Sequence, residues 1–243
     1  RIYPAIHYTM GGTWVDYNLM TTIPGLYAIG ECNFSDHGAN RLGASALMQG
    51  LADGYFVLPY TIGKYLSTQI SQDKITVDMP EFEQAELESI SKMRHIYEVQ
   101  GNQTVESIHK KLGKVIWDYC GMARNEKGLL KAINLVQDIK QEFWETVKIP
   151  GKFESFNDEL DKAGRVIDFI ELGDLMIRDA LNREESCGGH FREESQTETG
   201  EAKRIDHKFS YVSAWEYQNQ DDPKLHKENL EFENIKVAER SYK

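Results

Sequence analysis

Residues 37–47 read HGANRLGASAL, and the segments on either side of them determine what to expect of the first part of the chain. Before them, residues 25–31 read GLYAIGE, an apolar run that is typical of a buried strand. After them, apolar residues recur at helical spacing, which predicts a mostly buried helix over 44–66 that Pro59 kinks or interrupts. A strand, a polar loop with glycines and a helix therefore follow one another.

This order of elements leaves two interpretations of Arg41 open. The backbone N–H groups at the start of the helix, and the positive end of its dipole, would face anything bound beyond the end of the strand. An arginine held there can bind a carboxylate with two parallel hydrogen bonds. Alternatively, the segment is an ordinary connection in which Arg41 forms a structural ion pair.

The composition is ordinary for a soluble globular protein, with 40% hydrophobic and 28% charged residues in a chain of 243. The formal net charge of −11 argues against nucleic-acid binding, which needs a basic face. No apolar run approaches the ~20 residues that cross a bilayer. The cysteines Cys32, Cys120 and Cys187 are widely separated, so we expect reduced thiols in a cytosolic compartment and no metal site.

Residues 80–182 carry a series of amphipathic patterns that predict helices. The first helix begins at Pro80, and the next two follow the N-cap candidates Thr104 and Asn125. A fourth apolar stripe ends at Leu181. Helices joined by short turns bury such stripes against one another, so a helical bundle is expected here.

Short strands are expected on both sides of the bundle. Near the start of the chain they cover 1–8 and 13–15, before the strand of the GLYAIGE run. In the tail, 209–217 and 230–237 alternate large and small or polar residues, the pattern of strands with one buried face. The chain is therefore expected to be α+β, with a helical bundle and a small β tail.

Four blocks of sequence carry a resemblance to a known family: HYTMGG at 7–12, GLYAIGE at 25–31, HGANRLGASAL at 37–47 and ESCGGHFRE at 185–193. Their order and spacing resemble the flavoprotein subunit of succinate dehydrogenase and fumarate reductase, of which L-aspartate oxidase is a close relative. The resemblance covers the chain from its start to about Glu194.

The resemblance implies three regions. Residues 1–79 would be the carboxyl-terminal part of an FAD-binding α/β domain, 80–182 the helical bundle domain, and 183–243 a carboxyl-terminal loop and β tail. The family's Gly-x-Gly-x-x-Gly loop does not occur in this sequence. We therefore expect the chain to be the carboxyl-terminal part of a longer protein and to bind FAD poorly by itself. The arginine that shuttles the proton is expected upstream, so no catalytic residue is assigned here.

The resemblance also assigns site residues. His7 and Arg41 match the family's ligands of the substrate carboxylates. The matches to cofactor ligands are Gly11, Gly12, Glu31, Ala46 and Leu47. Taken alone, His7 is more typical of a structural histidine, and Glu31 of a surface residue or a structural ion pair.

Other residues near these blocks are less decisive. His37 is expected near the substrate, with a structural or flavin-edge role equally favoured. His190 and Arg192 either approach the flavin domain or have a structural role, and the structural reading is favoured. Cys187 has no partner at a spacing useful for a nucleophile or a metal ligand.

By this resemblance, the parent protein uses FAD to interconvert succinate and fumarate. Electrons would leave through an iron–sulfur subunit and a membrane quinone-reactive subunit, with the flavoprotein peripheral on the cytoplasmic face of the bacterial inner membrane. The alternatives are an L-aspartate oxidase-like enzyme, or a docking module for the iron–sulfur subunit that has no activity of its own.

Overall fold

The computed structural model describes residues 7–34, 45–218 and 223–238. The chain packs as two compact units. The first contains Arg1–Asp73, Cys187–Gly189 and Lys203–Lys243, and the second contains Lys74–Ser186 and His190–Ala202. Each unit is described by itself below. The domain boundaries expected from the sequence, after residues 79 and 182, stay a prediction.

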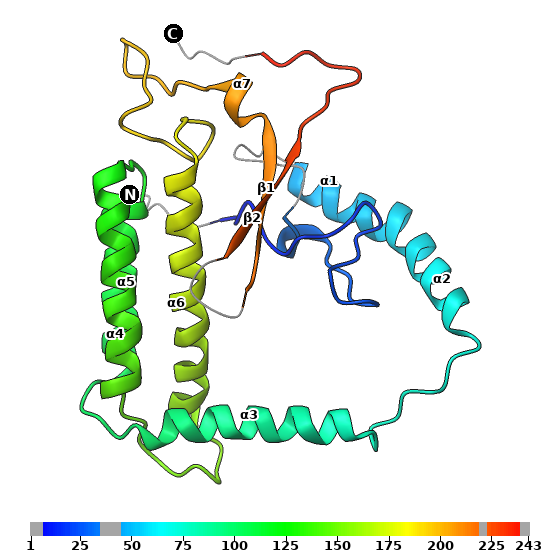
Figure 1. Ribbon diagram of the computed structural model, residues 1–243, viewed down its shortest axis with the longest axis vertical. Helices are drawn as coiled ribbons and strands as arrows, with labels where there is room; N and C mark the ends of the chain where they lie inside the picture. Colours follow the sequence, from blue (N-terminus) through cyan, green and yellow to red (C-terminus); the bar gives the residue numbers. More distant parts are fainter. Residues whose placement is uncertain (1–6, 35–44, 219–222, 239–243) are drawn as a thin grey trace, which may run out of the picture. The chain divides into compact units, whose positions relative to one another are not determined.

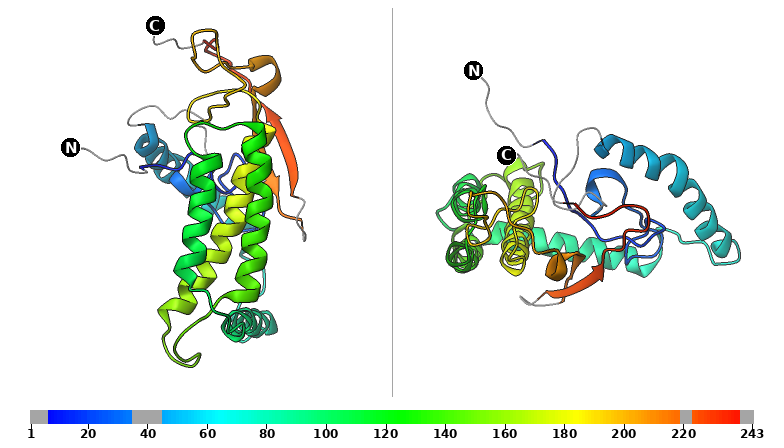
Figure 2. Two further views of the ribbon diagram at one scale, coloured as in Figure 1. Left: turned by 90° about the vertical axis from the view of Figure 1, so that its left-hand side faces the viewer. Right: turned by 90° about the horizontal axis from the view of Figure 1, so that it is seen from above.

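The second unit is helical. Its helices are α3 (Pro80–Glu98), α4 (Val105–Cys120), α5 (Glu126–Thr146) and α6 (Asp158–Asn182). Figures 1 and 2 show α4, α5 and α6 side by side, with α3 crossing one end of them. The expected helical bundle and its four helices are confirmed.

The N-caps explain where these helices begin. Thr104 Oγ1 accepts the backbone N–H of Ser107 at 3.1 Å, and Asn125 Oδ1 accepts that of Gly128 at 2.7 Å. Both expected caps are therefore confirmed. Asn157 caps α6 in the same way, which the sequence analysis did not anticipate. Each such cap satisfies an N–H group that has no partner inside its helix, and is typically worth about 1 kcal/mol.

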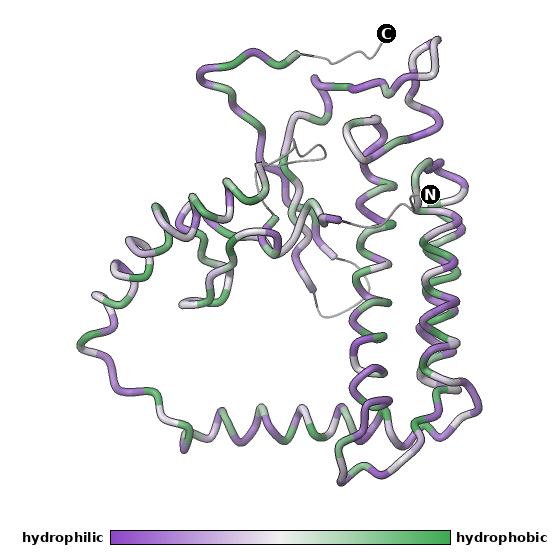
Figure 3. Tube along the Cα trace, turned by 180° about the vertical axis from the view of Figure 1, so that it is seen from behind, coloured by the Kyte–Doolittle hydropathy of each residue, from purple (hydrophilic) through white to green (hydrophobic). Residues whose placement is uncertain are grey.

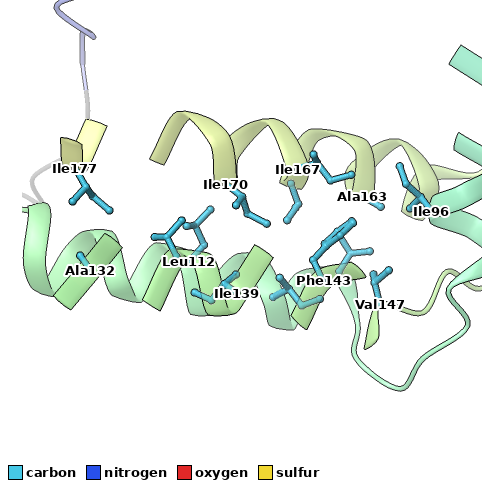
Figure 4. Packing of buried hydrophobic residues seen from close by; sticks show 14 of the residues in the cluster. Ile96, Leu112, Ala132, Ile139, Phe143, Val147, Ala163, Ile167, Ile170 and Ile177 are labelled. Carbon is cyan, nitrogen blue, oxygen red and sulfur yellow. The ribbon is translucent and has the colours of Figure 1, made fainter. Parts of the chain in front are cut away.

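The bundle encloses one apolar core, shown in Figure 4. Several of its side chains are fully buried, with exposed fractions of 0%: Ile96, Ile108, Leu129, Val136, Phe143 and Ile177. Removing a large apolar side chain from water stabilises the folded state by about 1.5–3 kcal/mol, so this core supplies most of the unit's stability.

Helix α3 contributes less to that core than its sequence pattern predicts. Its last turns pack inward through Ile96, whereas Phe82, Leu87 and Ile90 are 47%, 60% and 40% exposed. Because α3 crosses the end of the bundle (Figure 1), only one end of the helix reaches the other three. The expectation that its whole stripe is buried was wrong.

The first unit contains the helical segment that was expected over 44–66. It consists of α1 (Ser45–Ala52), a π-helical turn η2 (Asp53–Val57) and α2 (Leu58–Gln69). Pro59 lies in the first turn of α2, directly after the π-helical turn, so the predicted interruption is confirmed. A proline disrupts the helix before it because it lacks an N–H and its ring crowds the carbonyl four residues earlier.

The predicted burial of this helix was wrong. No described residue of α1 or α2 is buried, although apolar residues recur along both helices (Figure 3). Only Val57, between them, packs against a small cluster of Val15, Leu19 and Ala28. Apolar spacing marks a face suited to burial, but burial also needs a surface that covers the face, and the described residues do not supply one.

The short strands expected near the start of the chain are also wrong within the described residues. Residues 13–15 and 26–29 contribute only isolated bridges, Thr13 to Asn33 and Met20 to Tyr27. Within the GLYAIGE run, Gly25 and Gly30 have positive φ angles of +84° and +66°. The run then continues into the 3₁₀ turn η1 (Gly30–Cys32). These turns leave too few extended residues for a ladder. Residues 1–6 lie outside the described residues.

The tail forms a two-stranded antiparallel hairpin. Strand β1 (Tyr211–Glu216) follows the short helix α7 (Asp206–Phe209) and pairs with β2 (Lys224–Asn229). The strand expected over 209–217 is confirmed, whereas the one over 230–237 is wrong. Alternation gives the period of a strand but not its partner, and the backbone of 224–229 is what pairs with β1.

Candidate functional site

The segment that carries His7 lies against the turn that carries Glu31. Thr13 N donates to Cys32 O at 2.8 Å, and Phe34 N donates to Thr13 O at 3.0 Å. Gly12 lies so close to this turn that an added Cβ would be 2.4 Å from Cys32 O. A glycine is therefore required at position 12 for the two backbones to approach.

Glu31 joins the same two segments through its side chain. Its Oε1 accepts the backbone N–H of Thr9 at 2.8 Å, and its side chain is exposed. The partner found is a backbone amide rather than the charged group expected of an ion pair. A carboxylate has about four acceptor positions, so this hydrogen bond leaves capacity for the hydroxyls of a ligand.

Gly11 faces open space. Its φ is +123°, and no atom lies within 4 Å of the place where a Cβ would be. A flat ligand can therefore approach the backbone here without meeting a side chain. The neighbouring His7 is exposed. The two glycines thus differ in their surroundings. Gly11 faces open space, whereas Gly12 is in close contact with the backbone at Cys32.

Helix α1 lies beside this turn through Gln49 and Gly50. Helix α1 packs against η1 closely enough that a Cβ on Gly50 would be 3.6 Å from Gly30 Cα. Ala46 and Leu47 follow Ser45 in the part of α1 that the structure describes.

Six of the predicted site residues therefore lie on three segments of one unit that contact one another: His7, Gly11, Gly12, Glu31, Ala46 and Leu47. Arg41 and His37 lie outside the described residues. For FAD, the observations that fit are the open space at Gly11 and the carboxylate of Glu31. The roles of these residues stay predictions.

In the second unit, Arg192 binds backbone groups at the end of a helix. Its side chain is 4% exposed and its Nη1 donates to the carbonyls of Ala180, Leu181 and Arg183 at 3.0, 3.2 and 3.3 Å. These carbonyls lie at the end of α6, where they have no partner inside the helix. Arg192 thus satisfies the C-terminus of α6, which supports the structural reading.

His190 belongs to the same network. Its Nε2 lies 2.7 Å from Arg183 O and its Nδ1 lies 2.9 Å from Arg124 Nη1. A guanidinium only donates, so we assign Nδ1 as the acceptor and Nε2 as the N–H group. Burial lowers the pKa of His190, and the positive charges of Arg124 and Arg192 lower it further, although the Arg183 carbonyl opposes them. The imidazole is therefore neutral.

Sequence patterns did not predict that Arg124 would contact His190 or that Thr9 would contact Glu31. Arg124 precedes α5 and meets His190 from 66 positions away, and Thr9 meets Glu31 from 22 positions away. No local spacing encodes either pair. The one feature of the sequence that could have drawn attention to Arg124 is its position directly before the predicted N-cap Asn125.

The described ranges hold no group of three or more His, Cys, Asp or Glu side chains arranged to bind a metal ion. Burial raises the pKa of the Cys120 thiol, and Cys32 Sγ donates to Ile29 O at 3.1 Å. Across that same part of the chain, no helix combines the length and apolar composition needed to span a bilayer.

Two family models match the chain. The model described as fumarate reductase flavoprotein C-term matches residues 109–242, and the model of an FAD binding domain matches residues 1–47. The second match assigns FAD as the cofactor of this domain family. It covers the residues whose three segments converge in the first unit.

Individual relatives agree with these matches. The chain is 28% identical to the succinate dehydrogenase flavoprotein subunit of Bacillus subtilis over 98% of this chain and 41% of that protein. It is 27% identical to the L-aspartate oxidase of Yersinia pestis over 78% of this chain and 32% of that protein. A structure of a variant E. coli quinol fumarate reductase shares the fold, with a TM-score of 0.77 over 96% of this chain and 38% of that one at 22% identity. The chain thus spans about two fifths of the length of such relatives.

Proposed function

Because the chain belongs to the fumarate reductase flavoprotein family, we propose that it is part of the FAD-bearing subunit of a succinate dehydrogenase or fumarate reductase. The activity proposed is the interconversion of succinate and fumarate. The observation that supports the proposal is the contact among the His7 segment, the Glu31 turn and α1, because these segments carry an exposed histidine, a carboxylate and the open backbone at Gly11.

In this proposal, His7 and Arg41 bind the two carboxylates of the substrate. Arginine matches a carboxylate with two parallel hydrogen bonds, and a histidine at the other end fixes the orientation of the molecule. Holding the reacting carbons in one position lowers the barrier by removing the entropy cost of alignment. No residue of this chain is proposed to transfer the proton.

The cofactor contacts follow from the same three segments. Glu31 would accept hydrogen bonds from the ribose hydroxyls of FAD, and the backbone at Gly11 and Gly12 would contact the flavin. The N–H groups of Ala46 and Leu47 would bind the pyrimidine edge of the flavin, where a helix dipole would stabilise added negative charge by ~0.3–1 kcal/mol. When bound, FAD supplies the hydride acceptor or donor of the reaction.

The proposal extends to partners. Electrons from the flavin pass to an iron–sulfur subunit, whose clusters require cysteine ligands, and then to a quinone-reactive membrane subunit. The flavoprotein is then peripheral on the cytoplasmic face of the bacterial inner membrane. We also propose that the helical bundle, which has a core of its own, serves as a docking module for the iron–sulfur subunit.

An L-aspartate oxidase-like enzyme is the second candidate. The similarity to the Yersinia pestis enzyme supports it, but leaves about a fifth of the chain unmatched, whereas the similarity to the succinate dehydrogenase subunit extends over nearly all of it. Oxidation of succinate, but not of L-aspartate, by the flavin-loaded enzyme that contains this chain would separate the two.

Arg41→Ala in that flavin-loaded enzyme tests the site. Truncating one partner of a charge pair costs about 2–5 kcal/mol, so the dissociation constant for malonate is expected to rise by about 30-fold or more. Arg165→Ala, which removes an exposed arginine paired with Asp161, is the matched control and should leave that constant unchanged. Unchanged malonate affinity in Arg41→Ala contradicts the assignment.

A further inference from the structure

The hydrogen bond from Thr9 to Glu31 has no role in the function proposed above. Thr9 N donates to Glu31 Oε1 at 2.8 Å. Thr9 lies two residues after His7 and two residues before Gly11. The carboxylate assigned to the cofactor therefore also holds the middle of the segment assigned to the substrate.

Further contacts between the two segments lie farther along the chain. The backbone hydrogen bonds at Thr13 fix the segment four residues beyond Thr9. Gly12 also contacts the Glu31 turn, so closely that an added Cβ would be 2.4 Å from Cys32 O. The bond from Thr9 restrains the segment two residues from His7, so Glu31 contributes to the direction of the chain at His7.

We propose that Glu31 is a positioning residue for the dicarboxylate site, acting through Thr9 on His7. The inference rests on the substrate role proposed for His7. One oxygen of the carboxylate holds Thr9, and its remaining acceptor positions serve the ribose hydroxyls of the cofactor. Binding of the cofactor therefore orders Glu31, and Glu31 in turn orders the segment that binds the substrate.

Two replacements separate the length of this side chain from its charge. Glu31→Gln keeps an acceptor oxygen at the same reach and removes the charge. Glu31→Asp keeps the charge and shortens the reach by one methylene, so that the carboxylate no longer meets Thr9 N. A positioning role predicts that Gln preserves the segment and that Asp and Ala release it.

The first measurement needs no flavin. Hydrogen exchange at the Thr9 amide, followed by mass spectrometry of peptides covering 7–13, is expected to be about fivefold to tenfold faster in Glu31→Ala and Glu31→Asp, and within twofold of the parent in Glu31→Gln. Glu81→Ala, which removes an exposed carboxylate from α3, is the control for net charge and should change nothing. Unchanged exchange in Glu31→Ala overturns the proposal.

The second measurement uses the flavin-loaded enzyme that contains this chain. At saturating FAD, Glu31→Ala is expected to weaken malonate binding about fivefold, and Glu31→Gln to keep it within twofold. Full malonate affinity in Glu31→Ala also overturns the proposal. If the Glu31→Ala enzyme does not bind FAD, hydrogen exchange at the Thr9 amide alone decides whether the proposal holds. If His7→Ala leaves malonate affinity unchanged while Glu31→Ala speeds exchange at Thr9, the proposed function of His7 fails and the contact stands.

Discussion

The helical bundle and the α1–α2 segment carry apolar residues at similar helical spacing, yet only the bundle buries them. Leu129 and Phe143 in α5 are 0% exposed, whereas Leu47 in α1 and Phe56 between α1 and α2 are 76% and 75% exposed. The difference is the presence of a partner surface. Helices α4, α5 and α6 cover one another, while the geometry near α1 depends on backbone contacts and a few polar groups.

The largest effect is expected from truncating the same side chain in both regions. Phe143→Ala removes a fully buried ring and should lower the free energy of unfolding of the bundle by about 3–5 kcal/mol. Phe56→Ala should change stability by less than about 0.5 kcal/mol. Native-state hydrogen exchange of α5 amides measures the first effect, and that of α2 amides measures the second. Similar losses in the two variants would show that the ring of Phe56 is buried in solution.

Arg192 tests whether a polar network also holds the bundle. Arg192→Ala leaves the carbonyls of Ala180 and Leu181 at the end of α6 without their donor, while Arg183 O keeps His190, and should cost about 2–4 kcal/mol. Arg165→Ala removes an exposed ion pair and should cost less than about 1 kcal/mol. Exchange at the last amides of α6 reports the difference. Equal, small effects would contradict the structural role assigned to Arg192.

Glycines sharpen the comparison in the first unit. Gly12→Ala places a Cβ against Cys32 O, and we expect a loss of about 1–3 kcal/mol, because backbone cannot yield as a flexible side chain does. Gly63→Ala in α2 meets no atom within 4 Å and should stabilise that helix by about 1 kcal/mol. Exchange rates of residues 13–34 and of α2 test the two. Gly12→Ala with unchanged exchange would contradict the close approach.

Sequence patterns therefore predict the bundle better than the site. Thr104 and Asn125 were found as caps because a cap acts within three residues along the chain. The hairpin was half predicted, since alternation cannot choose between 224–229 and 230–237 as the partner of β1. The family blocks led to Glu31 and Gly11, but the bond from Thr9 to Glu31 joins residues 22 positions apart, and only the folded chain reveals it.

The smallest effect expected is a pH dependence confined to the bundle. Burial lowers the pKa of His190 below its ordinary value of 6.5, and the nearby charges of Arg124 and Arg192 lower it further. The unfolded chain therefore binds a proton that the folded chain does not. Stability from this group is complete above about pH 6.5 and is lost as the pH falls through the lower pKa of the folded state, at about 1.4 kcal/mol for each pKa unit of difference.

Replacing the histidine isolates this effect. Gln has a donor and an acceptor but does not titrate here, so His190→Gln should flatten the pH dependence of bundle stability between pH 5 and 7 (approximately the range in which histidine charge changes). His207→Gln, which removes an exposed histidine of α7, should leave the profile unchanged. The profile comes from hydrogen exchange of α6 after correction for intrinsic rates. If the parent and His190→Gln have the same slope, the imidazole is not held neutral by Arg124 and the end of α6 is stabilised by Arg192 alone.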